Sequence, residues 1–399
     1  MDPYLSDWLT ILLRWLHVVA GIAWIGASFY FIYLDLSLRP PKRREDRQAG
    51  VSGEFWAVHG GGFYHSQKYR VAPATLPYPL HWFKWEAYTT WLSGFALFVV
   101  LYYANAEQFL IDPQVADISP AVAVAASVGL LALAWVVYDG LCRLLAGRAL
   151  VLGLAVALFT VAAAYGTAQL FSGRAAFVQV GAMLGTMMAG NVLFNIIPAH
   201  RELVRAKQEG RQPDATPGLR AKERSVHNNY LTLPVVFAMI SNHFPLAYGH
   251  ARNWLVLLVL MAIGAWVRHF FNLRHQGRTR WSILVTAGVA LVVLVVVLRP
   301  DDGATADAER AEPVAFAEVE GIIEERCAAC HSSAPTEVSS APGGVTFDTP
   351  DEIAAHVEAI RRQAVDSRAM PPGNVTGMTD EEREQLGAWI RQGALLSEP

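Results

Sequence analysis

The sequence contains little cysteine, and this scarcity limits the kinds of metal site that it can build. Only 3 of its 399 residues are cysteines. A structural zinc site needs four ligands, so Cys327 and Cys330 would require a second cysteine or histidine pair at matching spacing. The remaining cysteine, Cys142, lies inside a hydrophobic segment. The cysteine content therefore disfavours a zinc-binding module.

Charged residues are also few, at 17% of the chain against 53% hydrophobic residues. The apolar residues are concentrated in stretches that approach the roughly 20 residues needed to cross a bilayer. We predict eight crossings, at residues 9–37, 85–104, 122–142, 150–171, 176–199, 230–244, 254–272 and 282–298. Any one of them could be a buried helix of a soluble protein, and the sixth is short and interrupted by Pro234. Eight in series predict an all-α, polytopic membrane helix bundle.

Two further absences narrow the choice. Residues 1–8 lack basic residues, and the first apolar segment is longer than the core of a signal peptide, so we expect no cleavable signal. The chain also shows no convincing internal repeat with broken apolar segments, which is the pattern typical of secondary transporters. A transporter fused to a redox sensor stays open as an alternative, without a sequence feature in its favour.

The most informative motif is Cys327-Ala328-Ala329-Cys330-His331. The pattern Cys-x-x-Cys-His is typical of c-type haem attachment. On one helical turn the two sulfurs can reach the two vinyl groups on one edge of the porphyrin, while the histidine ligates the iron. We therefore predict one covalent haem c on Cys327 and Cys330, with His331 as an axial ligand.

A second axial ligand is expected downstream, and methionine is the usual partner where a positive potential is required. Met370 is the first choice, because the following Pro371-Pro372-Gly373 cannot continue a helix and would hold the methionine in a rigid loop. Met378 and His356 are less favoured alternatives. A methionine that merely packs in the core is the non-functional explanation.

Helical patterns flank this region, over Val314 to Arg326 and Asp380 to Gln392. The apolar face of the second pattern consists of Leu386, Trp389 and Ile390. Two helices beside a haem, with a loop that carries methionine, resemble the small class I cytochrome c domain. We predict an integral membrane catalytic domain, a linker and a periplasmic cytochrome c domain, over residues 1–299, 300–312 and 313–399.

The distribution of positive charge predicts the orientation. The loops that join segments 1 to 2, 3 to 4, 5 to 6 and 7 to 8 carry twenty Lys and Arg residues, against two in the loops on the other face. By the positive-inside rule the first set is cytoplasmic. Both termini then lie outside, where haem is attached to such motifs in bacteria. We expect a protein embedded in the lipid bilayer of the bacterial inner (cytoplasmic) membrane, with its termini and cytochrome domain in the periplasm.

Polar residues near the ends of the apolar segments form two groups, and ionisable residues within membrane segments are functional candidates by default. The inner group is His59, His65, His81, Lys84, Glu86, Asn191, Asn195, His200, His227, Asn228, Arg268 and His269. The outer group is His17 and His243. Within the long loop over residues 39–84, the three glycines at 60–62 would let the backbone approach a planar ligand closely.

The chain resembles the membrane-bound urate hydroxylase (urate oxidase) family. The features that carry the resemblance are the glycine-histidine loop over residues 54–95, the His17 segment, the Asn-His motifs of segments 5 and 6, the eight crossings and the terminal cytochrome c domain. The resemblance covers essentially the whole chain. It implies an oxidoreductase of purine catabolism that converts urate to 5-hydroxyisourate, with water as the oxygen source. It also implies that electrons leave through haem c to a downstream soluble cytochrome c or cytochrome oxidase. No nucleic-acid partner is expected.

Urate is a flat, oxygen-rich anion, so its enzyme should offer Arg or Lys and amide donors beside an aromatic or glycine face. We expect a cytoplasm-facing site built from residues 56–91 against segments 5 to 7. Lys84 or Glu86 would be the base that activates water, and Arg70 or Arg268 would hold the anion. The remaining candidate catalytic residues are His59 and His65.

Electrons from such a site would have to cross a hydrocarbon core of about 30 Å, which is too far for one efficient tunnelling step. The first segment resembles that of membrane oxidases of the protoporphyrinogen-oxidising type, whose first-helix histidine is linked to haem b. We predict that His17 and His243 ligate a haem b, with Gly21 and Gly26 making room for the macrocycle. Alternatively, both histidines merely satisfy hydrogen bonds.

One other function fits the residues taken alone. The chain could be a membrane electron-transfer protein that passes electrons from quinol to cytochrome c without urate chemistry. Reduction of its cytochrome by quinol, but not by urate, would favour that alternative.

Overall fold

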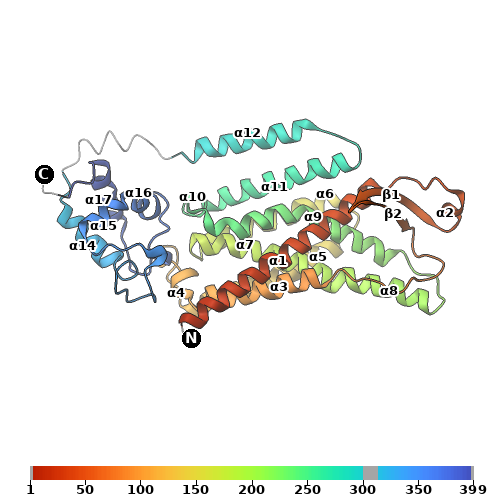
Figure 1. Ribbon diagram of the computed structural model, residues 1–399, viewed down its shortest axis with the longest axis horizontal. Helices are drawn as coiled ribbons and strands as arrows, with labels where there is room; N and C mark the ends of the chain where they lie inside the picture. The colour runs from red at the N-terminus through yellow and green to blue at the C-terminus, as the bar shows by residue number, and fades with distance from the viewer. Residues whose placement is uncertain (1–2, 300–312, 397–399) are drawn as a thin grey trace.

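The computed structural model describes residues 3–299 and 313–396, which form an elongated helix bundle and a smaller helical part at one end of it (Figure 1). The predicted linker, residues 300–312, lies outside the described residues. We call the two parts the N-terminal bundle and the C-terminal domain. The helices of the bundle are α1 (Pro3–Ser37), α2 (Arg44–Gln48), α3 (Trp85–Phe98), α4 (Ala106–Phe109), α5 (Pro120–Leu144), α6 (Ala149–Ala168), α7 (Gly173–Gly190), α8 (Ile197–Gln208), α9 (Thr216–Ile240), α10 (Pro245–Tyr248), α11 (Asn253–His275) and α12 (Trp281–Val297).

All eight predicted apolar segments lie in helices, but fewer of them meet the length and composition expected of a crossing. Among the described residues, five helical stretches are long and apolar enough to cross a membrane, namely Tyr4–Ser37, Pro120–Leu144, Ala149–Ala168, Gly173–Gln208 and Asn253–His275. Five of the eight predicted crossings therefore meet this criterion. Helix α12 is apolar but has only 17 residues, α3 has 14 before a π-helical turn, and α9 begins with a polar stretch.

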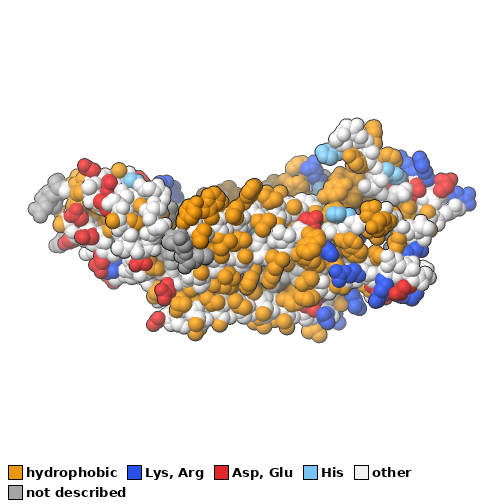
Figure 2. All heavy atoms as spheres, turned by 60° about the horizontal axis from the view of Figure 1, so that its bottom comes forward, with side chains coloured by type: hydrophobic (Ala, Val, Ile, Leu, Met, Phe, Trp, Pro, Cys, Tyr) orange, Lys and Arg blue, Asp and Glu red, His pale blue; other side chains and the backbone are white. Residues whose placement is uncertain are grey.

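Helix α7 lies at the centre of the bundle, because its side chains are buried on almost every face. Phe177, Met183, Leu184 and Met187 are fully buried there. The outer helices instead expose apolar side chains such as Val289 of α12. Figure 2 shows hydrophobic side chains covering the length of the bundle, with Lys and Arg gathered at the end opposite the C-terminal domain. This distribution suggests a membrane protein, with the apolar surface facing lipid.

The long loop after α1 contains a β-hairpin, the one sheet among the described residues of a bundle that is otherwise consistent with the predicted all-α class. Strands β1 (Val51–His59) and β2 (Gly62–Tyr69) pair antiparallel. The two-residue connection is Gly60-Gly61, with φ of +57° and +80°. Positive φ at both central residues is what the favoured type I′ hairpin turn requires. The glycines that we interpreted as a platform for a planar ligand thus form the tip of a hairpin.

The C-terminal domain contains α14 (Phe316–Arg326), α15 (Pro350–Ala355), α16 (Val357–Ile360) and α17 (Asp380–Arg391). The two helices predicted from periodicity are confirmed as α14 and α17, and they pack against each other. The predicted apolar face of α17 is buried in the core of the domain. The Thr379 side chain accepts a hydrogen bond from the backbone N–H of Glu382, and the Glu382 side chain accepts one from the backbone N–H of Thr379. This pair of bonds is a capping box at the start of α17. The sequence therefore specifies this pair of helices locally.

An ion pair joins the ends of these two helices. Arg326 of α14 donates from Nε and Nη2 to the carboxylate of Glu382, at 2.9–3.1 Å. Burial alone would raise the pKa of Glu382, but the hydrogen bonds from Arg326 and from the Thr379 backbone outweigh it, so this pKa lies below its usual range. Arg326 also donates to the Thr376 carbonyl, which fixes the start of α17 against the end of α14.

Candidate functional site

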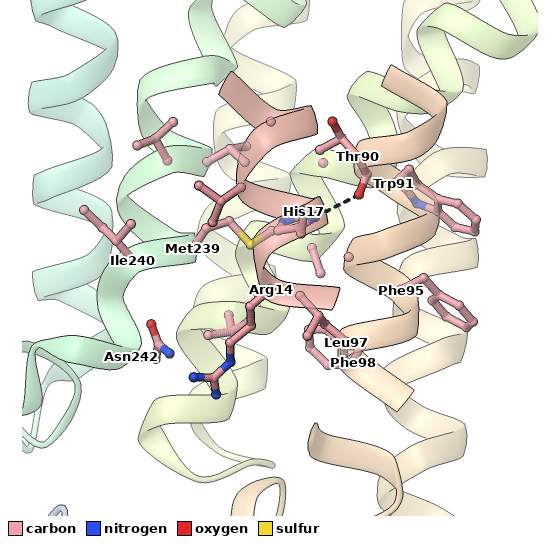
Figure 3. Close-up of a pocket in the computed structure, with 18 of the residues that line it drawn as sticks. Arg14, His17, Thr90, Trp91, Phe95, Leu97, Phe98, Met239, Ile240 and Asn242 are labelled. Carbon is pink, nitrogen blue, oxygen red and sulfur yellow. Dashed lines mark hydrogen bonds between the residues drawn. The ribbon is translucent and has the colours of Figure 1, made fainter. Parts of the chain in front are cut away.

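A cavity of about 460 Å³ opens between α1, α3, α7 and α9 (Figure 3). Ligand pockets of proteins usually enclose about 300–1,000 Å³, so the space is large enough for a small molecule or part of a cofactor. Its wall on α1 extends from Arg14 to Ser28. At 1.5 Å per residue this stretch is roughly 20 Å long. The cavity thus follows α1 over much of a bilayer core.

His17 and His243, which we predicted as a pair of haem ligands, both line this cavity. The Nδ1 atom of His17 lies 3.0 Å from the Thr90 carbonyl oxygen. A carbonyl only accepts, so Nδ1 carries the proton and the Nε2 lone pair is left for a ligand. A Cβ at Gly94 of α3 would lie 2.7 Å from His17 Cε1, so Gly94 makes room for the imidazole. Gly21 lines the cavity, whereas Gly26 is not among its lining residues.

One end of the cavity is cationic and contains unpaired polar atoms. Figure 3 shows Arg14 and Asn242 nearer this end than His17, and Arg174 lines the cavity as well. Arg174 Nε and Asn242 Oδ1 are buried without a hydrogen-bond partner. Buried polar groups are nearly always paired in native proteins, so these two atoms point to missing partners. Arg174 Nε is a donor and fits an anion such as a porphyrin carboxylate, whereas Asn242 Oδ1 is an acceptor and requires a donor.

A second group of unpaired polar atoms lies between α9, α11 and α1. Arg268 is only 4% exposed, Asn229 1% and Asn272 5%. The Nε atom of Arg268 donates to Asn229 Oδ1 at 2.5 Å, and its guanidinium lies over the Phe29 ring at 3.7 Å. Arg268 Nη2, Asn229 Nδ2 and Asn272 Oδ1 are buried without partners. We call these three residues with Phe29 the Arg268 cluster.

The chemistry of the Arg268 cluster matches a flat, anionic, hydrogen-bonding ligand. Two of its free atoms are donors and one is an acceptor, and the planar guanidinium provides the positive charge. None of the four cluster residues lines the cavity, but Ser28, the neighbour of Phe29 on α1, does. Along α1 the cluster therefore lies level with the end of the cavity at Ser28.

On the opposite face of α9 the polar side chains satisfy one another. Arg224 donates to Asp139 at 2.6 Å and to Asn191 at 3.1 Å. Asn191 in turn donates to Tyr138 at 2.9 Å and to Asn228 at 2.8 Å. These bonds tie α5, α7 and α9 together at the π-helical turn over residues 191–196. Since its members pair with one another, this network is suited to fixing the helices rather than to binding a ligand.

The other five predicted catalytic residues make no hydrogen bond, ion pair or ring contact with the Arg268 cluster in the described part of the chain. His65 stacks on Trp56 at 4.1 Å and lies 2.9 Å from Glu54 in the hairpin. The pKa of Glu54 is lowered, chiefly by the hydrogen bond from the backbone N–H of Lys42 and secondly by the hydrogen bond to the His65 side chain. The hairpin borders a hollow of about 730 Å³ against the ends of α1 and α11.

The other candidates lie at the edges of the bundle. His59 ends β1 at the exposed tip of the hairpin, and Arg70 is exposed after β2. Lys84 and Glu86 begin α3, where the Lys84 ammonium lies 5.6 Å from the centre of the Trp85 ring. None of these four residues lines either of the two cavities. Of the six predicted catalytic residues, Arg268 is the one with a buried, unpaired polar atom.

In the C-terminal domain, Cys327, Cys330 and His331 project from one turn, because the N–H groups of Cys330 and His331 both donate to the Cys327 carbonyl, at 3.1 and 2.9 Å. Both cysteines are free thiols. Burial raises the pKa of Cys327 to about 12 and also raises that of Cys330. His331 Nδ1 donates to the Val345 carbonyl at 3.0 Å, which leaves Nε2 for iron. This donor set fits a c-type haem. Among the described residues no group of three or more His, Cys, Asp or Glu is arranged to hold a metal ion.

Met370 lies on a loop that Arg383 holds in place. Arg383 Nη1 donates to the Met370 carbonyl at 2.8 Å and to that of Ala364. Met370 itself packs at the edge of the core, whereas Met378 is fully buried within it. His356 Nδ1 donates to the Glu352 carbonyl at 2.8 Å. The partly buried Met370 is thus better situated than Met378 to reach a ligand outside the core.

Sequence reasoning did not identify several residues of these sites. Arg14 and Arg174 were not among the predicted site residues, and Thr90 carries no signal in the sequence that would pair it with His17. Asn272 could have been found, because it lies four residues after Arg268 and therefore on the same helix face. Asn229 directly follows Asn228, but consecutive helical residues face different neighbours.

The N-terminal bundle matches a known family. Residues 3–299 match the family model described as Urate oxidase N-terminal. No curated protein and no solved structure matches the chain. The matched range includes both the cavity and the Arg268 cluster, and it supports an oxidoreductase that acts on urate. The chain belongs to the urate oxidase N-terminal family.

Proposed function

We propose that the protein oxidises urate to 5-hydroxyisourate within the membrane and delivers the electrons to its own C-terminal cytochrome. The reaction consumes one urate and one water, and it releases two electrons and two protons. Since a cytochrome accepts one electron at a time, each turnover requires two transfers. The final oxidant is a downstream soluble cytochrome c or a cytochrome oxidase. The observation that carries the proposal is the set of unpaired buried atoms in the Arg268 cluster, within the range that matches the family.

The chain's own residues would bind and orient the substrate. Arg268 Nη2 and Asn229 Nδ2 can donate to urate oxygens, and Asn272 Oδ1 can accept from a urate N–H. The Phe29 ring lies against the guanidinium at 3.7 Å and would hold it in place. The buried setting strengthens each of these interactions relative to water. For the water that becomes the new oxygen, we keep Lys84 or Glu86 as the proton acceptor, at the start of α3.

Two haem groups complete the proposal. Cys327, Cys330 and His331 would hold haem c, with Met370 as the second axial ligand, and this haem supplies a one-electron acceptor with a positive potential. His17 and His243 would hold a haem b in the cavity, which supplies an intermediate acceptor between the two faces. Arg14 and Arg174 would then pair with its carboxylates. The proposed location is the inner membrane, with the cytochrome on the periplasmic side.

The spectrum of the purified, anaerobic protein before and after urate tests the activity. Urate should reduce the haem c, and an equal concentration of xanthine, which lacks the C8 oxygen, should not. A cytochrome that is reduced by quinol but not by urate refutes urate oxidation and supports the quinol alternative.

A pyridine haemochrome assay tests the cofactors. We expect one covalent haem c and one extractable haem b per chain, with the haem b lost in a His17→Ala variant. One haem c without extractable haem b refutes the role of His17 and His243 while leaving urate oxidation testable.

A further inference from the structure

The C-terminal domain touches the N-terminal bundle through main-chain contacts that leave no space for a side chain. Gly373 follows Met370 by three residues and has φ of +59°. A Cβ at Gly373 would lie 2.7–2.9 Å from the carbonyl oxygens of Glu107, Gln108 and Ile111, at the C-terminal end of α4. Figure 1 shows α4 directly beside the C-terminal domain. The loop is therefore in direct contact with the bundle.

A second glycine makes the same kind of contact from the other side. Gly249 of the bundle follows α10, and a Cβ there would overlap the Ser367 carbonyl oxygen of the C-terminal domain. One glycine from each part thus permits the close approach. Because even a methyl group cannot be accommodated at either place, the fit is specific to this relative position of the two parts.

A hydrogen bond supports the same docking. Gln114 Nε2 of the bundle donates to the Met378 carbonyl at 3.0 Å. Within the C-terminal domain, Arg383 donates to the Met370 carbonyl at 2.8 Å. The docked segment, residues 367–378, is therefore the loop that carries the proposed axial methionine.

The other face of α4 lies on the cavity. Phe109 lines the cavity, and the Arg174 guanidinium lies 5.3 Å from the centre of its ring. Two residues further on, the Ile111 carbonyl faces Gly373. A single short helix therefore separates the cavity from the Met370 loop.

We propose that this contact, the Met370 loop on the end of α4, is the interface through which electrons pass from the membrane domain to the cytochrome. The C-terminal domain then stays docked on the N-terminal bundle while electrons are transferred. Two electrons cross the interface, one at a time, for each urate oxidised. The cytochrome then passes each electron on to the external acceptor. This inference rests on the proposed function and specifies its electron route.

A Gly249→Ala variant tests the proposal, because its added methyl group displaces the C-terminal domain without changing the proposed haem or substrate residues. Gly288→Ala, in α12 with open space around it, is the matched control. Hydrogen exchange of residues 367–378 reports docking, and stopped-flow reduction of the cytochrome by urate reports transfer. We expect lost exchange protection and at least tenfold slower reduction in Gly249→Ala, with an unchanged haem c potential and unchanged reduction by ascorbate.

The outcomes separate this inference from the proposed function. Lost protection with an unchanged rate of reduction by urate refutes the interface, and so does unchanged protection. If Gly249→Ala does not accumulate, Gln114→Ala removes the hydrogen bond to Met378 and is measured in the same way. A wild-type protein whose cytochrome urate does not reduce refutes the proposed function itself, and with it the electron route that rests on it.

Discussion

Replacing Arg268 gives the most direct test of the substrate site. An Arg268→Met variant keeps a long, unbranched side chain over Phe29 but removes the guanidinium. Arg268 is 4% exposed, and its Nη2 atom is buried without a partner. In the proposed complex that atom donates to the urate anion, so its loss should weaken binding of urate.

The size of the effect follows from the chemistry of the contact. A hydrogen bond that involves a charged group contributes about 1.5–3 kcal/mol. Since about 1.4 kcal/mol corresponds to a tenfold change in affinity, KM for urate should rise about 10- to 150-fold. Arg268 also donates to Asn229 at 2.5 Å, so the variant leaves a buried acceptor unpaired. That loss should reduce the free energy of unfolding by about 1–3 kcal/mol.

The assay is the initial rate of cytochrome reduction by urate in detergent-solubilised protein, normalised to haem c content. Arg278→Met is the matched control, because Arg278 is an exposed arginine beyond the end of α11. An Arg268→Lys variant should retain part of the affinity, since it keeps the charge but not the planar group that lies over Phe29. Wild-type KM in Arg268→Met, at normal haem content, would show that urate binds elsewhere.

Three further predictions concern other parts of the chain. Glu86→Gln and Lys84→Met should each reduce urate-driven cytochrome reduction at least tenfold without changing the haem spectrum, and unchanged turnover in both would remove them from the mechanism. Met370→Ala should lower the haem c potential, because methionine ligation raises it, whereas a methionine-to-iron charge-transfer band that persists in the variant would transfer the role to Met378. The pKa of Glu382 is lowered in the folded protein, so its contribution to stability is complete above about pH 5 and is lost as the pH falls through the folded value. In acid titrations followed by haem absorbance, Glu382→Gln should therefore unfold at a less acidic pH than Asp380→Asn, and coincident curves would contradict this ion-pair contribution.

The sequence by itself determined the local features of this protein. Apolar runs predicted eight helical segments, and the structure has a helix at each of these positions. The spacing of Cys327, Cys330 and His331 predicted one turn, and the backbone hydrogen bonds form that turn. The predicted apolar face of α17 is buried in the core of the C-terminal domain. These features depend on residues within a few positions of one another, so the sequence pattern contains them directly.

Tertiary structure alone decided which distant residues meet. Arg268 pairs with Asn229 across 39 positions, and no periodicity predicts that α9 presents Asn229 to α11 and Asn228 to α7. The sequence of Gly60, Gly61 and Gly62 was compatible either with close approach to a planar ligand or with a tight turn. The antiparallel pairing of β1 with β2 places these glycines at a hairpin turn. The docking of Gly373 on α4 joins segments that lie more than 250 positions apart in the sequence. Such contacts depend on how whole helices pack, and packing is a property of the folded chain rather than of any one segment.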